Sequence, residues 1–247
     1  MNGLLSIVIP VRNEAANIGP MLKGVTSALT VPAEFLIVYD DESDSTLPVV
    51  NCLSCSFRSP GGQTAPDEVY RTVKNTIGPG PANALKAGFS AARGEAIVVM
   101  MADISDDHRA LTPMIQKFES GYDLVCGSRY MPGGEQIGGP WLKGKLSRMA
   151  GLSLHTLGLP SHDATNSFKL YRTQRLRSLN LRSAGGFEIN LEIIVKAWRA
   201  GWRITEVPTR WTDRTAGRSN FKLLRWLPRY LKWYAYALGV GALGPIQ

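Results

Sequence analysis

Residues 4–14 read Leu4-Leu5-Ser6-Ile7-Val8-Ile9-Pro10-Val11-Arg12-Asn13-Glu14, a short apolar run that stops at a proline and then turns polar. A short apolar run of this kind is typical of a strand buried on both faces of a sheet. Residues 16–29 then show helical spacing, and residues 35–39 form a second apolar run. Strands that alternate with helices in this way predict a parallel sheet covered by helices on both faces.

The same alternation continues along the chain. We expect strands at residues 4–9, 35–39, 69–73, 96–101, 123–126, 167–171 and 203–207, and helices at 16–29, 46–53, 81–92, 109–119, 141–157, 186–200 and 221–238. Glycine-rich or polar loops fill 131–139 and 213–219. The sequence therefore predicts an α/β fold of the Rossmann-like type with a mostly parallel sheet flanked by helices. We expect residues 1–219 to form this domain, and residues 220–247 to form an interfacial helix and tail.

Composition narrows the class of protein. Apolar side chains make up 44 % of the 247 residues, which is typical of a globular chain rather than a disordered or multi-span one. The three cysteines are an odd number, which excludes a scaffold stapled only by disulfides. The N-terminal residues carry neither a basic segment nor a small-residue cleavage site, so we expect a cytoplasmic protein.

Most of the formal net charge of +8 lies near the C-terminus. From Trp202 onward the chain has eight basic and two acidic residues, together with four of its six tryptophans. Basic side chains mixed with aromatic rings suit the surface of an anionic membrane, although a solvated basic helix or a nucleic-acid contact would show the same pattern. Pro228, Arg229 and Lys232 interrupt the apolar residues of 226–246, so we expect this segment to lie in the membrane interface and not to span the bilayer.

Polar residues directly follow four of the predicted strands. They are residues 12–14, 40–45, 103–107 and 128–130, and they include several carboxylates and two arginines. Because ligands of open α/β sheets bind beyond the carboxyl ends of the strands, we expect these groups to share one site. Clustered carboxylates bind a hard divalent cation, which in turn holds phosphates.

Several other kinds of site do not occur in the sequence. It contains no G-x-x-x-x-G-K-[ST] phosphate loop and no G-x-S-x-G nucleophile motif, and residues 78–83 lack the third glycine of a dinucleotide fingerprint. Cys52 and Cys55 form a lone C-x-x-C pair, whereas a structural zinc site needs four ligands. These absences leave the acidic strand ends as the leading candidate for chemistry.

The order and spacing of the motifs resemble those of family-2 glycosyltransferases of the GT-A fold, and most closely the branch of dolichyl-phosphate mannose synthases and bacterial polyprenyl-phosphate glycosyltransferases. The matching segments are residues 6–14, 39–46, 78–94, 102–103, 127–134, 163–168, 187–192, 206–208 and 213–219. Each motif is weak alone, and the resemblance rests on their common order across nearly the whole chain.

The resemblance implies a role for each part of the site. Pro10, Arg12, Glu14 and Asp41 are expected to line the nucleotide pocket, and Asp103 to hold a divalent cation, Mg²⁺ or Mn²⁺, on the diphosphate. Arg129 is expected to contact the phosphate of a lipid acceptor. The resemblance also assigns Arg214 to the phosphate clamp, and Arg148 and Ser219 to the acceptor phosphate, with Lys145 as the alternative to Arg148. The catalytic set is then Asp103, Arg129 and Arg214.

Two departures from the family pattern affect this assignment. Met101 stands where the usual D-x-D signature has its first aspartate, so the cation would lean on another carboxylate such as Asp41 or Glu192. Asn220 follows Ser219 where the family motif ends in lysine, which removes one phosphate-binding cation.

The resemblance implies an inverting enzyme that moves a hexose from GDP-mannose or a UDP-sugar to a polyprenyl or dolichyl monophosphate, at the cytoplasmic face of a membrane and with a possible membrane-protein partner. A phosphate acceptor is already anionic, so this reaction needs no strong general base. Two alternatives remain open at this point. A saccharide or lipid hydroxyl acceptor would require a base, for which Asp163 is the nearest candidate, and the loss of the D-x-D aspartate at Met101 would also fit a non-catalytic nucleotide-sugar binder.

Overall fold

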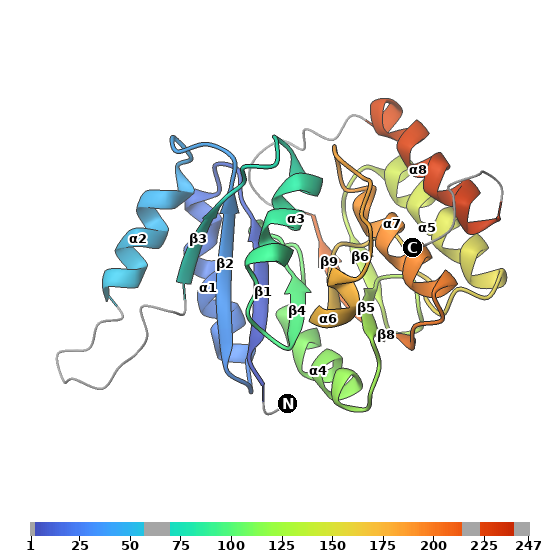
Figure 1. Cartoon of the computed structure of the whole chain (residues 1–247), viewed down its shortest axis with the longest axis horizontal. Helices are drawn as coiled ribbons and strands as arrows, with labels where there is room; N and C mark the ends of the chain where they lie inside the picture. The colour runs from blue at the N-terminus through green and yellow to red at the C-terminus, as the bar shows by residue number, and fades with distance from the viewer. Residues whose placement is uncertain (1–2, 57–69, 214–222, 240–247) are drawn as a thin grey trace.

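A seven-stranded sheet in the order β3-β2-β1-β4-β7-β5-β8 runs through the centre of the molecule (Figure 1). The structure is a computed structural model that describes residues 3–56, 70–213 and 223–239. The strands of this sheet are β1 (Leu5–Pro10), β2 (Ala33–Tyr39), β3 (Tyr70–Lys74), β4 (Ala96–Val99), β5 (Leu124–Ser128), β7 (Lys169–Arg172) and β8 (Ile204–Pro208). All neighbouring pairs are parallel except those of β7, which is antiparallel to both β4 and β5. The predicted mostly parallel α/β sheet is confirmed.

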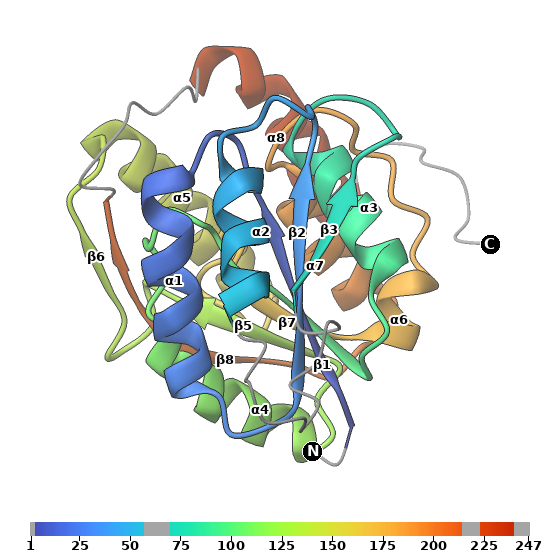
Figure 2. The ribbon, with the colours of Figure 1, turned by 90° about the vertical axis from the view of Figure 1, so that its left-hand side faces the viewer.

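Helices cover both faces of the sheet. They are α1 (Ala15–Ala28), α2 (Thr46–Ser56), α3 (Pro81–Ala91), α4 (Leu111–Glu119), α5 (Trp141–Thr156), α6 (Thr173–Arg177), α7 (Ile189–Arg199) and α8 (Leu223–Ala237), with a 3₁₀ turn at His108–Ala110. Figure 2 shows α1 and α2 on one side of β1 and β2, with α3 on the other. Successive side chains of β1 point to opposite faces of the sheet, so this strand contributes to two hydrophobic cores. Leu5, Ile7 and Ile9 pack with α1 and α4 on one face, and Val8 packs with α3 on the other.

Three short elements are missing from the sequence prediction. The glycine-rich stretch 131–139, predicted as a loop, contains β6 (Glu135–Ile137), which pairs in parallel with β9 (Arg210–Thr212) in a separate two-stranded sheet. The five-residue helix α6 was also not expected. Segments of three to five residues with mostly exposed side chains are too short for hydrophobic periodicity to reveal them.

The C-terminal helix α8 packs on α7 and α5, as Figure 1 shows. Trp233 is only 2 % exposed and donates a hydrogen bond from Nε1 to Ser183 Oγ at 3.0 Å. Arg199 of α7 donates to the Tyr236 carbonyl at 2.7 Å. The aromatic face of the predicted basic helix therefore joins the core, while Leu231 and Lys232 stay exposed. The expected domain boundary at 219/220 lies outside the described residues, and none of the described helices is long and apolar enough to cross a membrane.

Gly88 allows α3 to lie against β1 and β2. A Cβ atom at this position would come within 2.4 Å of Val8 Cγ1 and 3.1 Å of Val38 Cγ2. We expect Gly88→Ala to lower the free energy of unfolding by about 1–3 kcal/mol, because the core must shift to accept the methyl group. Urea denaturation would measure this loss. Ser90→Ala, at an exposed position of the same helix, is the control: it leaves the contact between α3 and the sheet unchanged, so it is expected to change stability by less than about 0.5 kcal/mol. Equal effects at both positions would contradict the argument.

Candidate functional site

The nucleotide-binding residues expected from the sequence lie at the carboxyl ends of β1 and β2. Pro10 ends β1, and Arg12 is exposed in the loop that follows. Glu14 accepts a hydrogen bond from Asn17 Nδ2 at 2.7 Å. Asp41 is exposed, and hydrogen bonds from the backbone and side chain of Ser43 lower its pKa, so its carboxylate stays ionised. The four residues therefore share one edge of the sheet, as predicted.

Two neighbouring aspartates build this edge. Asp44 is buried and accepts from the backbone N–H groups of Asn13 at 3.1 Å and Thr46 at 2.9 Å, which ties the loop after β1 to the loop after β2. Asp40 accepts from Asn75 Nδ2 at 2.7 Å and Gly80 N at 3.0 Å, which fixes the start of α3. Asp41 and Glu42 are both exposed, but Glu42 forms an ion pair with Lys74 at 2.9 Å, and Asp40 and Asp44 hold the loops in place.

The loop after β4 carries Asp103 in a strained turn. Asp103 Oδ1 accepts from Ser105 N at 3.2 Å, and the residue between them, Ile104, has a φ of 60°. A β-branched residue rarely adopts this left-handed conformation, and such strain concentrates at functional sites. Asp103 is only partly buried, so this turn presents a carboxylate at the end of β4, where the sequence places the cation.

Asp106 is a second carboxyl group in the same loop, and sequence reasoning did not single it out. Its Oδ2 accepts from the backbone N–H of Met101 at 3.1 Å, and the side chain is buried. Burial raises the pKa of Asp106 to about 7, with a further increase from the charge of Asp103. An aspartate three residues after Asp103 in the acidic run 103–107 was the available signal, but its burial depends on tertiary structure.

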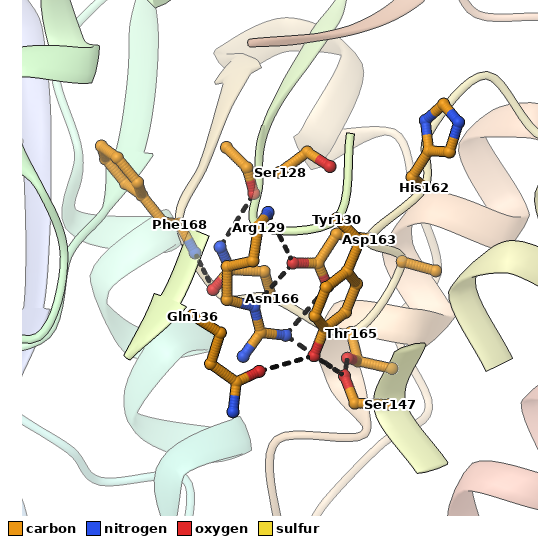
Figure 3. Close-up of polar contacts among 12 residues, drawn as sticks. Ser128, Arg129, Tyr130, Gln136, Ser147, His162, Asp163, Thr165, Asn166 and Phe168 are labelled. Carbon is orange, nitrogen blue, oxygen red and sulfur yellow. Dashed lines mark hydrogen bonds and ion pairs between the residues drawn. The ribbon is translucent and has the colours of Figure 1, made fainter. Parts of the chain in front are cut away.

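Arg129 at the end of β5 forms a buried ion pair with Asp163, which Figure 3 shows. Arg129 Nε donates to Asp163 Oδ2 at 2.6 Å and Nη2 donates to Oδ1 at 2.9 Å. Burial lowers the pKa of Arg129, but the charge and hydrogen bonds of Asp163, together with smaller contributions from Tyr130 and Asp106, outweigh burial and raise that pKa, so the guanidinium stays charged. Both oxygens of Asp163 accept hydrogen bonds from Arg129 and the side chain is buried, so in this structure Asp163 orients Arg129 and presents no free oxygen to the cavity.

Hydroxyl groups surround the outer edge of this ion pair (Figure 3). Arg129 Nη2 also donates to Ser147 Oγ at 3.2 Å, and Ser147 shares a 2.5 Å hydrogen bond with Thr165. The Tyr130 hydroxyl donates to Gln136 Oε1 at 2.9 Å. Arginine and hydroxyl donors in one place provide the groups that bind phosphate oxygens.

A cavity of about 520 Å³ connects the end of β4 with the helices α5, α7 and α8. Asp103, Ser105 and Arg129 line its polar part. Hydroxyl and amide side chains such as Ser147, Thr165 and Asn190 also line it, and a large apolar surface comes from Leu146 and Met149 of α5, Phe187 and Leu191 at α7, and Leu227, Tyr230, Leu231 and Tyr234 of α8. The cavity therefore brings Asp103 and Arg129 to one end of a largely apolar passage. Pro10, Arg12, Glu14 and Asp41 are not among its lining residues.

Arg148 and Lys145 both lie beside a second cavity, of about 650 Å³, which Arg129 also lines. The Arg148 guanidinium lies 5.9 Å from the centre of the Tyr130 ring, and Lys145 Nζ lies 5.0 Å from that of Trp141. Both cations are thus near the expected acceptor phosphate, and both stay candidates. Arg214 and Ser219 lie outside the described residues.

Glu192 is not available as a second cation ligand, which corrects one expectation. It is completely buried, pairs with Lys196 Nζ at 2.6 Å and accepts from the backbone N–H groups of Arg182 and Ser183 at 2.6 and 2.7 Å. This carboxylate stabilises the segment before α7 instead. The described residues also contain no group of three histidine, cysteine or acidic side chains arranged to hold a metal.

Comparisons with known proteins agree with this geometry. The model of the family described as Glycosyl transferase family 2 matches residues 6–179. The chain is 28 % identical over 240 residues to a dolichol-phosphate mannosyltransferase of Pyrococcus furiosus, covering 93 % of this chain and 64 % of that protein. It is 30 % identical over 223 residues to a polyprenol monophosphomannose synthase of Mycolicibacterium smegmatis, covering 87 % of this chain and 79 % of that protein. The chain belongs to glycosyltransferase family 2.

Solved structures share the fold. The glucosyl-3-phosphoglycerate synthase of Mycobacterium tuberculosis in complex with UDP superposes with a TM-score of 0.69 at 17 % identity, covering 98 % of this chain and 82 % of that one. The same synthase has been solved with Mn²⁺ and UDP-glucose, and with Mg²⁺ and UDP. The sheet and its flanking helices are therefore those of the GT-A fold.

The raised pKa of Asp106 predicts a pH-dependent stability. The folded protein keeps a proton on this carboxyl up to about pH 7, whereas the unfolded chain releases it near pH 4. The stability that protonated Asp106 contributes is therefore fully present below the pKa of this group in the unfolded chain. It is lost as the pH rises through the pKa of the group in the folded protein. The Asp106→Asn variant does not lose stability in this way. The difference in free energy of unfolding between this variant and wild type is therefore expected to grow, in favour of the variant, by at most about 1.4 kcal/mol for each pH unit between roughly 4 and 7. Urea titrations at pH 4.5 and pH 8, both with a chelator, would measure the difference. An Asn variant that gains nothing at pH 8 relative to pH 4.5 would show that Asp106 ionises normally.

Proposed function

We propose that this chain transfers a hexose from a nucleotide diphosphate sugar to a polyprenyl monophosphate, with inversion at the anomeric carbon. The observation that carries this proposal is the lining of the 520 Å³ cavity, which combines the charged groups Asp103 and Arg129 with a large apolar surface from α5, α7 and α8. A phosphorylated isoprenoid needs both surfaces, because its headgroup is a dianion and its chain is a hydrocarbon. The names of the two curated relatives, a dolichol-phosphate mannosyltransferase and a polyprenol monophosphomannose synthase, support the same acceptor class.

The chain's own groups suit this reaction. A phosphate oxygen of the acceptor attacks the anomeric carbon while the bond from that carbon to the diphosphate oxygen breaks. Arg129 is charged at every pH of interest, and its ion pair and the Ser147 contact fix its orientation toward the cavity. It would hold the attacking phosphate in line and lower its charge repulsion with the donor. Asp163, the base considered for a hydroxyl acceptor, is buried and paired with Arg129 through both oxygens, which favours the phosphate acceptor.

The acidic loop after β4 fits a divalent cation. Carboxylate oxygens are the ligands that Mg²⁺ and Mn²⁺ prefer, and Mg²⁺ usually takes only one or two protein carboxylates together with substrate phosphates. Asp103 would hold the cation, with Asp106 as the second carboxyl group of the same loop. When bound, the cation would neutralise charge on the departing nucleoside diphosphate. The side chain of Met101 offers no oxygen ligand to a cation. In this loop, Met101 contributes its backbone N–H, which donates a hydrogen bond to Asp106.

Helices α5 and α8 present a surface suited to a membrane. Trp141 is 69 % exposed and Met149 is 66 % exposed on α5, and Leu231 is exposed on α8. The exposed cations Lys145, Arg148, Arg229 and Lys232 accompany them on the same two helices. Apolar and aromatic side chains mixed with cations bind the interface of anionic bilayers. We propose that this surface places the cavity at the membrane, on its cytoplasmic face, where a prenyl chain can enter; a membrane-protein partner would bind in the same region.

A transfer assay tests the proposed function. The protein is incubated with radiolabelled UDP-glucose, UDP-N-acetylglucosamine or GDP-mannose, with Mg²⁺ or Mn²⁺, and with vesicles that contain undecaprenyl phosphate. Label that moves to the organic phase and is released by mild acid identifies a sugar phospholipid and the donor used. Nucleotide binding by calorimetry without transfer would favour the non-catalytic binder, and binding of none of these nucleotides would overturn the proposal.

Arg129→Lys separates the acceptor from the donor. Lysine keeps the charge but loses the planar fork that engages Asp163 and a phosphate at once, so the KM for the prenyl phosphate is expected to rise roughly tenfold or more. The calorimetric Kd for the nucleoside diphosphate is expected to change less than about twofold. Arg175→Lys, at an exposed arginine 3.5 Å from Asp123 beyond the opposite end of β5, is the matched control. Equal losses for acceptor and nucleotide would move Arg129 to the donor side.

Trp141→Glu tests the membrane surface. Replacing an exposed ring with a charge is expected to lower flotation with anionic liposomes at low salt by roughly five- to tenfold. Ile77→Glu is the control, because Ile77 is 54 % exposed after β3, at the far edge of the sheet from α5 and α8. Wild-type protein that does not float, or two variants that float alike, would rule out this surface.

A further inference from the structure

Asn190 carries two buried amide atoms without a partner among the described residues. It lies in the first turn of α7 and is only 1 % exposed, yet neither Nδ2 nor Oδ1 has a hydrogen bond. Its backbone N–H is satisfied by the Phe187 carbonyl at 3.1 Å, so the side chain is not needed to cap the helix. More than nine in ten buried polar groups in proteins are paired, and an unpaired amide is costly. Both amide atoms of Asn190 are therefore available to a group from outside the described chain.

This amide lies in the wall of the 520 Å³ cavity. Asn190 lines it together with Asp103, Arg129 and the apolar residues Phe187 and Tyr230. A ligand that enters the cavity is thus the available source of partners for both amide atoms. The position is distinct from the Arg129–Asp163 pair, which uses Ser147 and leaves Asn190 without a contact.

The chemistry of the amide selects among the parts of the proposed substrates. Oδ1 only accepts and Nδ2 only donates, so a full match must offer both a donor and an acceptor. A phosphate dianion only accepts and would leave Oδ1 unpaired, and a prenyl chain would leave both atoms unpaired. Sugar hydroxyls donate and accept, and two neighbouring hydroxyls match an amide in full.

We propose that Asn190 binds neighbouring hydroxyl groups of the hexose in the nucleotide donor and determines which sugar the enzyme transfers. This inference rests on the proposed function and adds a residue that recognises the sugar in the cavity that Asp103 and Arg129 also line. A site that hydrogen-bonds a substrate hydroxyl rejects analogues without that hydroxyl, because its own buried groups are then left unpaired. Asn190 thus acts on the sugar, while the nucleotide and the acceptor phosphate are bound by other groups.

The test uses Asn190→Leu, which replaces the amide with an apolar group of similar size, and Asn190→Ala as a second variant. Calorimetry with Mg²⁺ compares UDP with UDP-glucose and GDP with GDP-mannose. We expect the Leu variant to bind the nucleoside diphosphate within about twofold of wild type, and to lose roughly 10- to 100-fold of its affinity for the sugar nucleotide that wild type prefers. Deoxy-sugar donors are expected to be discriminated by wild type and not by the Leu variant. Asn51→Leu, at an exposed asparagine of α2, is the control.

Thermal unfolding gives a readout that a structural role would not produce. Removing an unpaired buried amide is expected to leave the Tm of the Leu variant equal to or above that of wild type. A Tm several degrees lower in both variants would show that the amide is paired within the protein and would overturn the inference. Equal losses for nucleoside diphosphate and sugar nucleotide, an effect confined to the KM of the prenyl phosphate, or unchanged binding would also overturn it. These outcomes concern Asn190 alone, whereas wild-type protein that binds no sugar nucleotide would remove the proposed function itself.

Discussion

The buried ion pair between Arg129 and Asp163 is the contact on which the rest of the site depends. Asp163 is inaccessible to solvent, and removing one member of a buried pair costs about 3–5 kcal/mol because the other charge is left uncompensated. The loop that carries Asp163 is held twice more, since Asn166 Nδ2 donates to the Gly127 carbonyl at 2.8 Å and the buried Lys169 donates to the carbonyls of Ala164 and Asn166. The orientation of Arg129 therefore follows from a loop that is fixed at several points.

The reversed strand β7 explains why this loop reaches the site at all. The residues before a parallel strand lie at the amino edge of the sheet, away from the ligand edge. Because β7 is antiparallel to β4 and β5, its amino end lies beside the carboxyl ends of both strands. Residues 163–168 are thereby placed between Asp103 on the β4 loop and Arg129 at the end of β5. The reversed direction of β7 thus brings a further polar loop to the edge of the sheet at which β4 and β5 end.

The sequence contains much of this arrangement but not all of it. The apolar runs of β1, β2, β4 and β5 and the polar residues after them could be predicted, because burial on both faces requires continuous apolar strands. The direction of β7 could not be predicted, because the periodicity of apolar residues indicates which residues are buried and carries no information on strand direction. The short pair β6–β9 has too few residues for a pattern. The raised pKa of Asp106 and the unpaired amide of Asn190 both depend on the residues that pack around them. Nothing in the sequence therefore distinguishes Asp106 from its neighbouring aspartates, or Asn190 from any other asparagine in a helix.

The loop after β4 keeps carboxyl groups near the end of the strand, although Met101 stands where the family motif has its first aspartate. The backbone N–H of Met101 donates to Asp106, so a carboxyl group from later in the loop returns to the end of β4. Asp106 shares this region with the charges of Asp103, Asp163 and Arg129, and the sum of burial and like charge favours its protonated form up to about pH 7. A cation at Asp103 would reverse this balance, because a nearby positive charge favours the ionised carboxylate. Cation and proton would then compete for the same loop, which keeps the carboxyl groups of Asp103 and Asp106 although residue 101 is a methionine.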